Sequence, residues 1–188
     1  MVLILGLGNP GPRYELTRHN AGFLVADTLA EKHRIPLDQH RHKSVYGRGE
    51  IEGCPVVVSK AMTYMNESGV AAKALLQAFS IPPERLIVVH DEIDLPLGKI
   101  KLKIKGGGAG HGGVGSIIQK LRTGEFTRFR IGVGRPENRE DVVDYVLSPF
   151  TDEEIPQVND ILEEAVLRIE HTLKAVHETS NKTEEQPE

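Results

Sequence analysis

The chain alternates between short apolar runs and longer segments in which apolar residues recur at helical spacing. Apolar or alternating runs typical of strands cover residues 2–5, 45–51, 55–59, 86–89 and 128–133. Helical spacing predicts helices over 21–33, 68–79 and 116–121, and a last helix that begins near 155. The Glu52-Gly53 turn between the second and third runs predicts an antiparallel pair of strands.

This alternation predicts an α/β fold: a single three-layer domain with a mixed, mostly parallel twisted sheet between helices. The 188 residues are enough for one domain with its own core. We place the domain at residues 1–177. The acidic residues 178–188, ETSNKTEEQPE, are expected to form a disordered tail.

Two adjacent segments have unusual composition. Residues 99–105 alternate strictly, which predicts a strand with Ile100, Leu102 and Ile104 facing the core and four lysines on the other face. Those lysines either guard a sheet edge or bind phosphates. Residues 106–115 contain seven glycines, so backbone N–H groups there can approach a ligand closely. The segment lacks the Lys-Ser/Thr pair of a nucleoside-triphosphate loop.

A long polar loop, residues 6–20, follows the first strand. It contains the G-x-G-x-x-G spacing of dinucleotide-binding proteins, but prolines flank the third glycine and no helix is predicted to open there. The next helix is expected at residue 21, with Asn20 as its N-cap. The loop therefore places Asn9, His19 and Asn20 at the C-terminal end of a strand, where α/β proteins build their sites.

Two later strands also lead into polar side chains. Asp91 leaves the 86–89 strand directly, which favours it as a working carboxylate. Asn66 follows the 55–59 strand, and it either caps the helix at 68 or contributes to a site.

The net charge of −4 conceals an uneven distribution. Residues 1–136 carry 19 Lys and Arg against 12 Asp and Glu, whereas residues 137–188 carry 4 against 15. The basic part permits a polyanionic partner. Cys54 is the single cysteine, so no intramolecular disulfide can form, which fits a reducing compartment. The short apolar N-terminus predicts neither a signal peptide nor a membrane span.

Four segments together resemble bacterial-type peptidyl-tRNA hydrolases. They are GLGNPGPRYELTRHNAGF, KAMTYMNESG, HDEIDLPLGKIKLKIKGGGAGHGGVGSI and FRIGVGRP, and the resemblance runs in register from residue 2 to about 177. It implies a monomeric, cytoplasmic esterase without metal or cofactor. Such an enzyme hydrolyses the ester between an N-blocked peptide and the 3′ ribose of tRNA, which recycles tRNA from aborted translation. The implied partner is peptidyl-tRNA, held by its acceptor arm and 3′ end, with no membrane.

The resemblance also implies roles for individual residues. His19 is the general base and Asp91 the carboxylate that orients its ring; the unperturbed pKa of a histidine suits proton abstraction near neutral pH. The implied substrate contacts are Asn9, Tyr14, Met65, Asn66, His111 and Gly112, with Asn20 helping to fix the loop. In this context the lysine stripe is favoured as a tRNA phosphate site, with Lys103, Lys105 and Arg130 chosen from a set that includes Lys101 and Arg128.

One position departs from the family pattern. Family members usually have His-Asn-Gly in the glycine-rich segment, whereas this chain has His111-Gly112-Gly113. A side-chain amide is therefore missing. We expect a consequence for substrate affinity more than for chemistry, since His19 and Asp91 are both present.

Three other protein classes would use some of the same residues. A dinucleotide-dependent enzyme requires an acidic residue at the end of a second strand, but the nearest candidate, Asp27, lies within a predicted helix. A metal phosphohydrolase would use the carboxylates of residues 91–94 with His90 or His111, and a chelator would abolish its activity. A non-catalytic RNA-binding protein on the same fold would be expected to lack His19 or its partner carboxylate.

Overall fold

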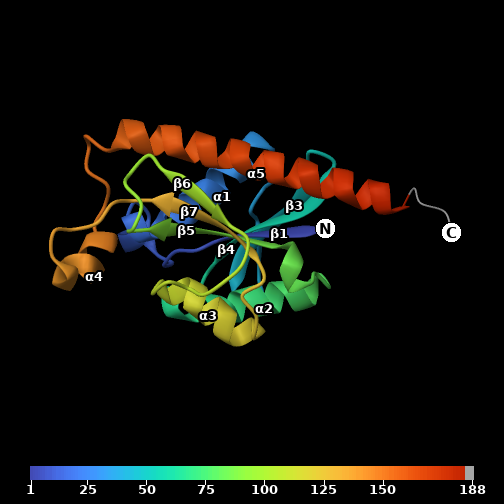
Figure 1. The fold of residues 1–188 in the computed structure, drawn as a ribbon, viewed down its shortest axis with the longest axis horizontal. Helices are drawn as coiled ribbons and strands as arrows, with labels where there is room; N and C mark the ends of the chain where they lie inside the picture. Colours follow the sequence, from blue (N-terminus) through green and yellow to red (C-terminus); the bar gives the residue numbers. More distant parts are fainter. Residues whose placement is uncertain (185–188) are drawn as a thin grey trace.

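A computed structural model describes the backbone of residues 1–184 and the side chains of residues 1–180 (Figure 1). Within this part, seven strands form one sheet in the order β2-β3-β4-β1-β5-β7-β6. The strands are β1 (Val2–Gly6), β2 (Gln39–Arg41), β3 (Ser44–Ile51), β4 (Cys54–Ala61), β5 (Leu86–Glu92), β6 (Ile100–Lys103) and β7 (Thr127–Gly132). Neighbours among β4, β1, β5 and β7 are parallel, whereas the pairs β2–β3, β3–β4 and β6–β7 are antiparallel. The predicted mixed, mostly parallel sheet and the 45–51 with 55–59 pairing are confirmed.

Helices cover both faces of the sheet. Figure 1 shows α1 (Ala21–Lys32) and α5 (Ile155–Glu184) on one face and α2 (Ser68–Ala78) and α3 (Gly112–Leu121) on the other. The short α4 (Val142–Val146) lies beyond one end of the sheet. Among the described residues, no helix combines the length and the apolar character that crossing a bilayer requires.

The sheet separates two hydrophobic cores. In β1, Ile4 packs with the core under α1 and α5, whereas Leu3 and Leu5 pack with the core under α2 and α3. This division follows from the strand geometry, because successive side chains point to opposite faces. Both faces of β1 and β5 are buried, which explains why these strands appear as continuous apolar runs in the sequence.

Helix α1 contacts the sheet through its backbone at Gly22. A Cβ atom at this position would overlap the carbonyl oxygen of Val89 and would lie 2.6 Å from Leu7 N. Glycine therefore lets the start of α1 approach the middle of β5 and the residue after β1 more closely than any other residue would. The loop that precedes α1 is thereby held beside the C-terminal end of β5.

The prediction of a strand over 99–105 is wrong in its extent. Strand β6 ends at Lys103, and of the three residues predicted to face the core only Ile100 is buried. Leu102 is 48% exposed and Ile104 69% exposed. The physical reason is that β6 is an edge strand paired only with β7, and the chain leaves the sheet before the alternation ends.

Other boundaries also differ from expectation. Helix α3 begins at Gly112 rather than at residue 116, because His111 caps it and allows the helix to start within the glycine-rich segment. Strand β2 (Gln39–Arg41) lies where no strand was predicted. Residues 178–184 continue α5. The remainder of the predicted disordered tail, residues 185–188, lies outside the described residues.

Candidate active site

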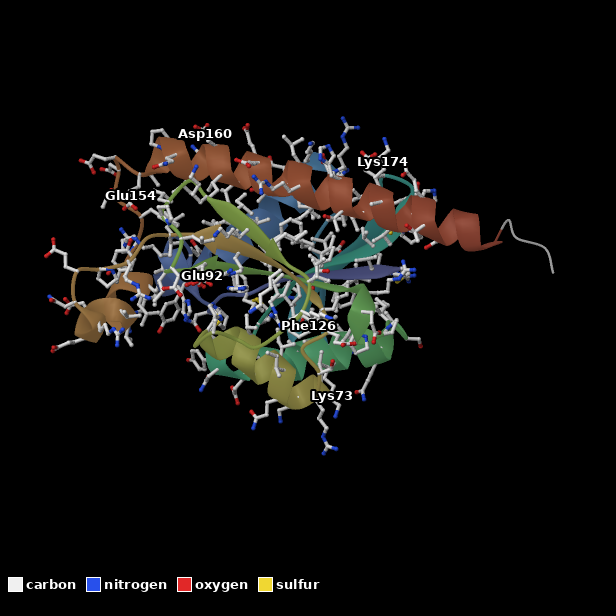
Figure 2. All side chains as sticks on the ribbon, in the orientation of Figure 1. Lys73, Glu92, Phe126, Glu154, Asp160 and Lys174 are labelled. Atoms are coloured by element: carbon white, nitrogen blue, oxygen red, sulfur yellow. The ribbon has the colours of Figure 1, made fainter. Side chains whose placement is uncertain are left out.

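A cavity of about 440 Å³ lies at the C-terminal end of the central strands. Its polar lining includes Asn9, His19, Asn66, Asp91 and His111. Its apolar lining includes Val142, Val143 and Val146 of α4 and Leu147, the residue after it, which together we call the apolar wall. Figure 2 shows Glu92 among the side chains gathered at this end of the sheet, with Glu154 on the segment that leads into α5. The cavity brings together residues from five separate parts of the chain.

Asp91, at the end of β5, accepts hydrogen bonds from two imidazole rings. Its Oδ2 lies 2.8 Å from His19 Nδ1, and its Oδ1 lies 2.7 Å from His111 Nε2. The tautomer of His111 follows from its other nitrogen, since Nδ1 accepts a hydrogen bond from Val114 N at 3.3 Å. His111 Nε2 therefore carries a hydrogen and donates to the carboxylate. His19 Nδ1 likewise donates, which leaves Nε2 as the basic nitrogen of His19.

The surroundings keep Asp91 ionised. Burial by itself would raise the pKa of this carboxyl group, but the facing rings of His111 and His19 favour the charged form, and the net effect is a pKa well below the usual value. His90 lies nearby, with Nδ1 2.7 Å from the carbonyl oxygen of Asp91. Burial, together with the neighbouring His111, lowers the pKa of His90 to about 3. His90 is therefore neutral near pH 7.

Asn9 is fixed by three hydrogen bonds. Its backbone N–H donates to Asn20 Oδ1 at 2.8 Å, and Asn20 Nδ2 donates back to the carbonyl of Asn9 at 3.0 Å. Met65 N donates to Asn9 Oδ1 at 2.8 Å. This leaves Asn9 Nδ2 available to the cavity. Asn20 precedes α1 as predicted, but its side chain makes this reciprocal pair instead of capping the helix.

The structure brings most of the other predicted substrate contacts to the cavity. Met65, Asn66 and Gly112 line it. Asn66 is exposed, and it does not cap α2, whose N-cap position is Glu67. A Cβ atom at Gly112 would meet no atom within 4 Å, so this part of the wall is open.

Tyr14 is not brought into this group. It is absent from the residues that line the cavity, within the part of the chain that the structure describes. Its carbonyl oxygen accepts hydrogen bonds from Thr17 Oγ1 at 2.8 Å and Thr17 N at 3.0 Å, so its visible role is to shape the loop before His19.

The three predicted tRNA contacts also lie outside the cavity lining. Lys103 Nζ donates to the carbonyl of Gly107 at 3.2 Å, and Arg130 Nε lies 3.1 Å from Glu92 Oε2. Lys105 is exposed and follows the end of β6. Of these three cations, Lys105 is the one for which the described residues show no partner.

Arg128 does not belong to the phosphate-binding stripe that the sequence suggested. It is 1% exposed, and its guanidinium donates to the carbonyls of Gly106, Gly107 and Gly124. Arg128 therefore organises the glycine-rich segment from within, and its alternation with Phe129 does not turn it towards solvent.

Sequence reasoning missed two parts of this site. One is the apolar wall on α4, whose signal was the cluster of valines at 142, 143 and 146 within a polar segment. The other is Arg18, which is buried beside His19 and contacts the segment after α4. A charged residue in a polar loop gave no sign of burial, although its position next to His19 was visible.

The fold does not support the hypothesis of a dinucleotide-dependent enzyme. Gly11, the third glycine of the fingerprint, is exposed, and α1 begins only at Ala21. At the fingerprint the chain forms only the short 3-10 helix Pro12–Tyr14, so no α-helix begins there with its N–H groups facing a pyrophosphate. Asp27, the candidate ribose partner, lies in α1 and forms an ion pair with Lys60 at 2.7 Å.

One cluster of side chains has the geometry of a metal site, but its hydrogen bonding does not suit a metal. Among the described residues, the donor atoms of His19, Asp91 and His111 lie within 4.8 Å of one another. Both rings, however, present N–H groups to the carboxylate in this arrangement, whereas a metal requires their lone pairs. The other carboxylates proposed for such a site are neutralised, since Glu92 pairs with Arg130 and Asp94 with Arg135.

Comparison with known proteins gives one consistent result. A family model described as peptidyl-tRNA hydrolase matches residues 3–188. The peptidyl-tRNA hydrolase of Bacillus subtilis strain 168 is 47% identical over 173 residues, which is 92% of each chain. That of Bacillus cereus strain Q1 is 48% identical over 165 residues, covering 88% of this chain and 89% of the relative.

A solved structure agrees with these sequence relatives. The crystal structure of peptidyl-tRNA hydrolase from Acinetobacter baumannii superposes with a TM-score of 0.88 at 36% identity. The superposition covers 96% of this chain and 91% of the other. The similarity therefore extends over the whole α/β domain and includes the end of the sheet where the cavity lies.

Proposed function

This chain belongs to the peptidyl-tRNA hydrolase family and acts on the ester bond of peptidyl-tRNA, and from that premise we propose that His19 is its general base and Asp91 the carboxylate that orients it. The observation that carries the proposal is the 2.8 Å contact between His19 Nδ1 and Asp91 Oδ2, with Asp91 buried and His19 lining the cavity. A base held in this way keeps one tautomer and presents Nε2 to the substrate.

The proposed reaction uses water as the nucleophile. His19 Nε2 takes a proton from the water as its oxygen bonds to the ester carbonyl carbon, and a tetrahedral intermediate forms. The bond from that carbon to the ribose 3′ oxygen then breaks, and the protonated His19 returns the proton to this oxygen. Peptide acid and tRNA are released, and no covalent enzyme intermediate or metal is required. General base catalysis of this kind contributes about 10²–10⁴-fold.

Amide side chains support the developing charge in this proposal. Asn9 Nδ2 is free because Asn9 Oδ1 already accepts a hydrogen bond from Met65 N. Asn66 lines the same cavity and is exposed to it. Neutral N–H donors fixed around a forming oxyanion lower the barrier, by about 2.7–4 kcal/mol per donor in well-studied cases.

His111 receives a different role from the one that the resemblance implied. Its ring is committed to Asp91 on one side and to Val114 N on the other. We therefore infer that His111 orients the carboxylate and does not itself bind the peptide. Gly112, which is open to the cavity, remains a proposed substrate contact through its backbone.

The proposed tRNA contacts are Lys103, Lys105 and Arg130. Lys105 is exposed and available, whereas Lys103 and Arg130 would exchange their present partners, Gly107 and Glu92, for phosphates. Such contacts position any tRNA without reading its sequence. We further propose that the enzyme acts as a monomer in the cytoplasm; the absence of any possible disulfide supports a reducing compartment.

The decisive test compares N-acetyl-aminoacyl-tRNA with free aminoacyl-tRNA, both in the presence of a chelator. Rapid cleavage of the blocked substrate alone is expected. His19→Ala and Asp91→Asn are each expected to lower kcat by about 10²–10⁴-fold, because one removes the base and the other its orientation.

His171→Ala on the exposed side of α5 is the matched control for loss of a histidine. Loss of activity with chelator in the wild-type protein would contradict the metal-free mechanism. Retention of full activity by His19→Ala would contradict the assignment of the base. Binding of tRNA without any cleavage would favour the RNA-binding alternative.

A further inference from the structure

The apolar wall of the cavity rests on a helix that is not stable by itself. Helix α4 spans only Val142–Val146, and isolated helices shorter than about 12 residues are marginal in water. Val143 is 64% exposed and Leu147 36% exposed, although both line the cavity. Apolar side chains displayed in this way suit an apolar part of the substrate. Whatever holds α4 in place therefore affects which substrates fit.

Arg18 contributes to that support through several contacts. Its Nη1 donates to the carbonyls of Pro149 at 3.0 Å and of Tyr145 and Ser148 at 3.4 Å. Its Nη2 lies 2.6 Å from Glu154 Oε1, and its guanidinium stands 4.3 Å from the centre of the Tyr145 ring. The side chain is only 7% exposed. The carbonyls lie at the C-terminal end of α4 and just after it, where the helix dipole favours a cation.

Backbone hydrogen bonds attach the same segment to the loop before His19. Arg18 N donates to the carbonyl of Ser148, and Phe150 N donates to the carbonyl of Leu16, both at 3.1 Å. An isolated antiparallel bridge lies between these bonds. The segment that follows the apolar wall is thus paired with the residues immediately before the proposed base.

Arg18 therefore links the apolar wall to His19. Its backbone continues directly into His19, and its side chain ends on the carbonyls of α4 and of the residues after it. We propose that Arg18 is a positioning residue that sets the apolar wall at a fixed separation from His19, and thereby selects the side chain of the amino acid that is esterified to tRNA. This inference rests on the proposed role of His19.

The test measures selectivity as well as rate. Steady-state kcat/KM is determined for N-acetyl-leucyl-tRNA and N-acetyl-alanyl-tRNA with the wild-type protein, Arg18→Lys and Arg18→Met. A displaced wall loses its contacts with the larger side chain, so the leucyl-to-alanyl ratio is expected to fall about fivefold in Arg18→Met. Arg18→Lys keeps the charge but cannot reach all four acceptors, so an intermediate ratio is expected.

A second variant removes another contact that holds the apolar wall, at a site away from His19. Tyr145 Oη donates to the carbonyl of Val133 at 2.6 Å, and Tyr145→Phe removes this bond while leaving the ring beneath Arg18. The leucyl-to-alanyl ratio of kcat/KM is expected to fall in this variant too. Arg48→Met, on the exposed surface of β3, is the matched control and should leave the ratio unchanged.

The outcomes separate positioning from simple stabilisation. If Arg18→Met and Tyr145→Phe lower the melting temperature but reduce activity equally on both substrates, Arg18 is only structural and the inference is overturned. A changed ratio in folded protein supports it. If His19→Ala keeps full activity, the proposed base fails, and this result is independent of the ratio in the Arg18 variants.

Discussion

Among single side chains, Asp91 is the one on which the others depend. It is buried at the end of β5 and accepts from His19 through one oxygen and from His111 through the other. Because both oxygens are occupied, the carboxylate cannot rotate without breaking a hydrogen bond. The orientation of His19 is therefore set indirectly by His111 and by the first turn of α3, where Val114 N donates to His111 Nδ1.

Replacement of His111 tests this indirect control. His111→Ala should lower kcat by about tenfold or more with little change in KM, since a small misplacement of a reacting group can cost up to about 10²-fold. His111→Gln should recover part of the loss, because its amide N–H can donate to Asp91. The measurement is steady-state kinetics with N-acetyl-aminoacyl-tRNA. A raised KM with unchanged kcat would instead identify His111 as a substrate contact.

Replacement of Gly112 is predicted to improve substrate binding, whereas replacement of His111 is predicted to slow the reaction. A Cβ atom there meets nothing within 4 Å, so Gly112→Asn can be accommodated without strain. The new amide would supply one more hydrogen bond to the substrate, worth about 1 kcal/mol, so KM should fall by about fivefold while kcat stays within about twofold. Gly107→Asn, also in open space but not among the cavity-lining residues, is the control. An unchanged KM would show that the substrate does not pass Gly112.

At the scale of elements, β5 couples the stability of the protein to pH. Burial, together with the neighbouring His111, lowers the pKa of His90 to about 3 from an ordinary value of 6.5. Between these values the unfolded chain binds a proton that the folded protein does not, so the free energy of unfolding falls as pH falls. From pH 7 to pH 5 the loss from His90 is about 2 kcal/mol.

Urea unfolding at both pH values checks this expectation. In His90→Gln the difference between pH 7 and pH 5 should be smaller than in the wild-type protein by about that 2 kcal/mol. His171→Gln, on the exposed side of α5, is the matched control. Equal pH dependence in His90→Gln and the wild-type protein would show that His90 is not buried in its neutral form.

The sequence revealed the elements whose signals are local. The β1 and β5 runs are apolar because both of their faces are buried, and α1 has clear helical spacing, so these were predictable. The full extent of β6 was not, because whether Leu102 is covered depends on neighbours distant in sequence. Similarly, Asn9, His19 and Asp91 could be placed at strand ends, whereas the burial of Arg18 depends on carbonyls about 130 residues later.

At the scale of the whole molecule, the uneven distribution of charge distinguishes an acidic part of the surface from a basic part. Figure 2 shows Lys174 on α5 and Lys73 on α2, on opposite faces of the sheet, and the acidic excess of residues 137–188 includes α5. We expect tRNA to avoid this acidic helix and to approach the edge of the sheet at β6. The affinity should then weaken steeply as salt increases, because phosphate contacts release counterions.

The salt dependence of binding to deacylated tRNA tests this arrangement. Lys105→Ala should weaken binding and reduce the slope of log affinity against log salt by about 1, as loss of one phosphate contact predicts. Lys174→Ala removes the same charge from α5 and should leave the slope unchanged. Affinity that does not vary between low and moderate salt would contradict phosphate-dominated binding.

The close approach of α1 to the sheet at Gly22 divides the site mechanically. The backbones of α1 and β5 touch, so His19, just before the helix, and Asp91, at the end of the strand, move as one stiff body. The wall on α4 is tied to this body mainly through Arg18 and a few hydrogen bonds. Slow fluctuations of the structure should therefore change the width of the cavity while leaving the hydrogen bond between His19 and Asp91 intact. As the temperature rises, the protein should therefore lose substrate selectivity before it loses catalytic activity.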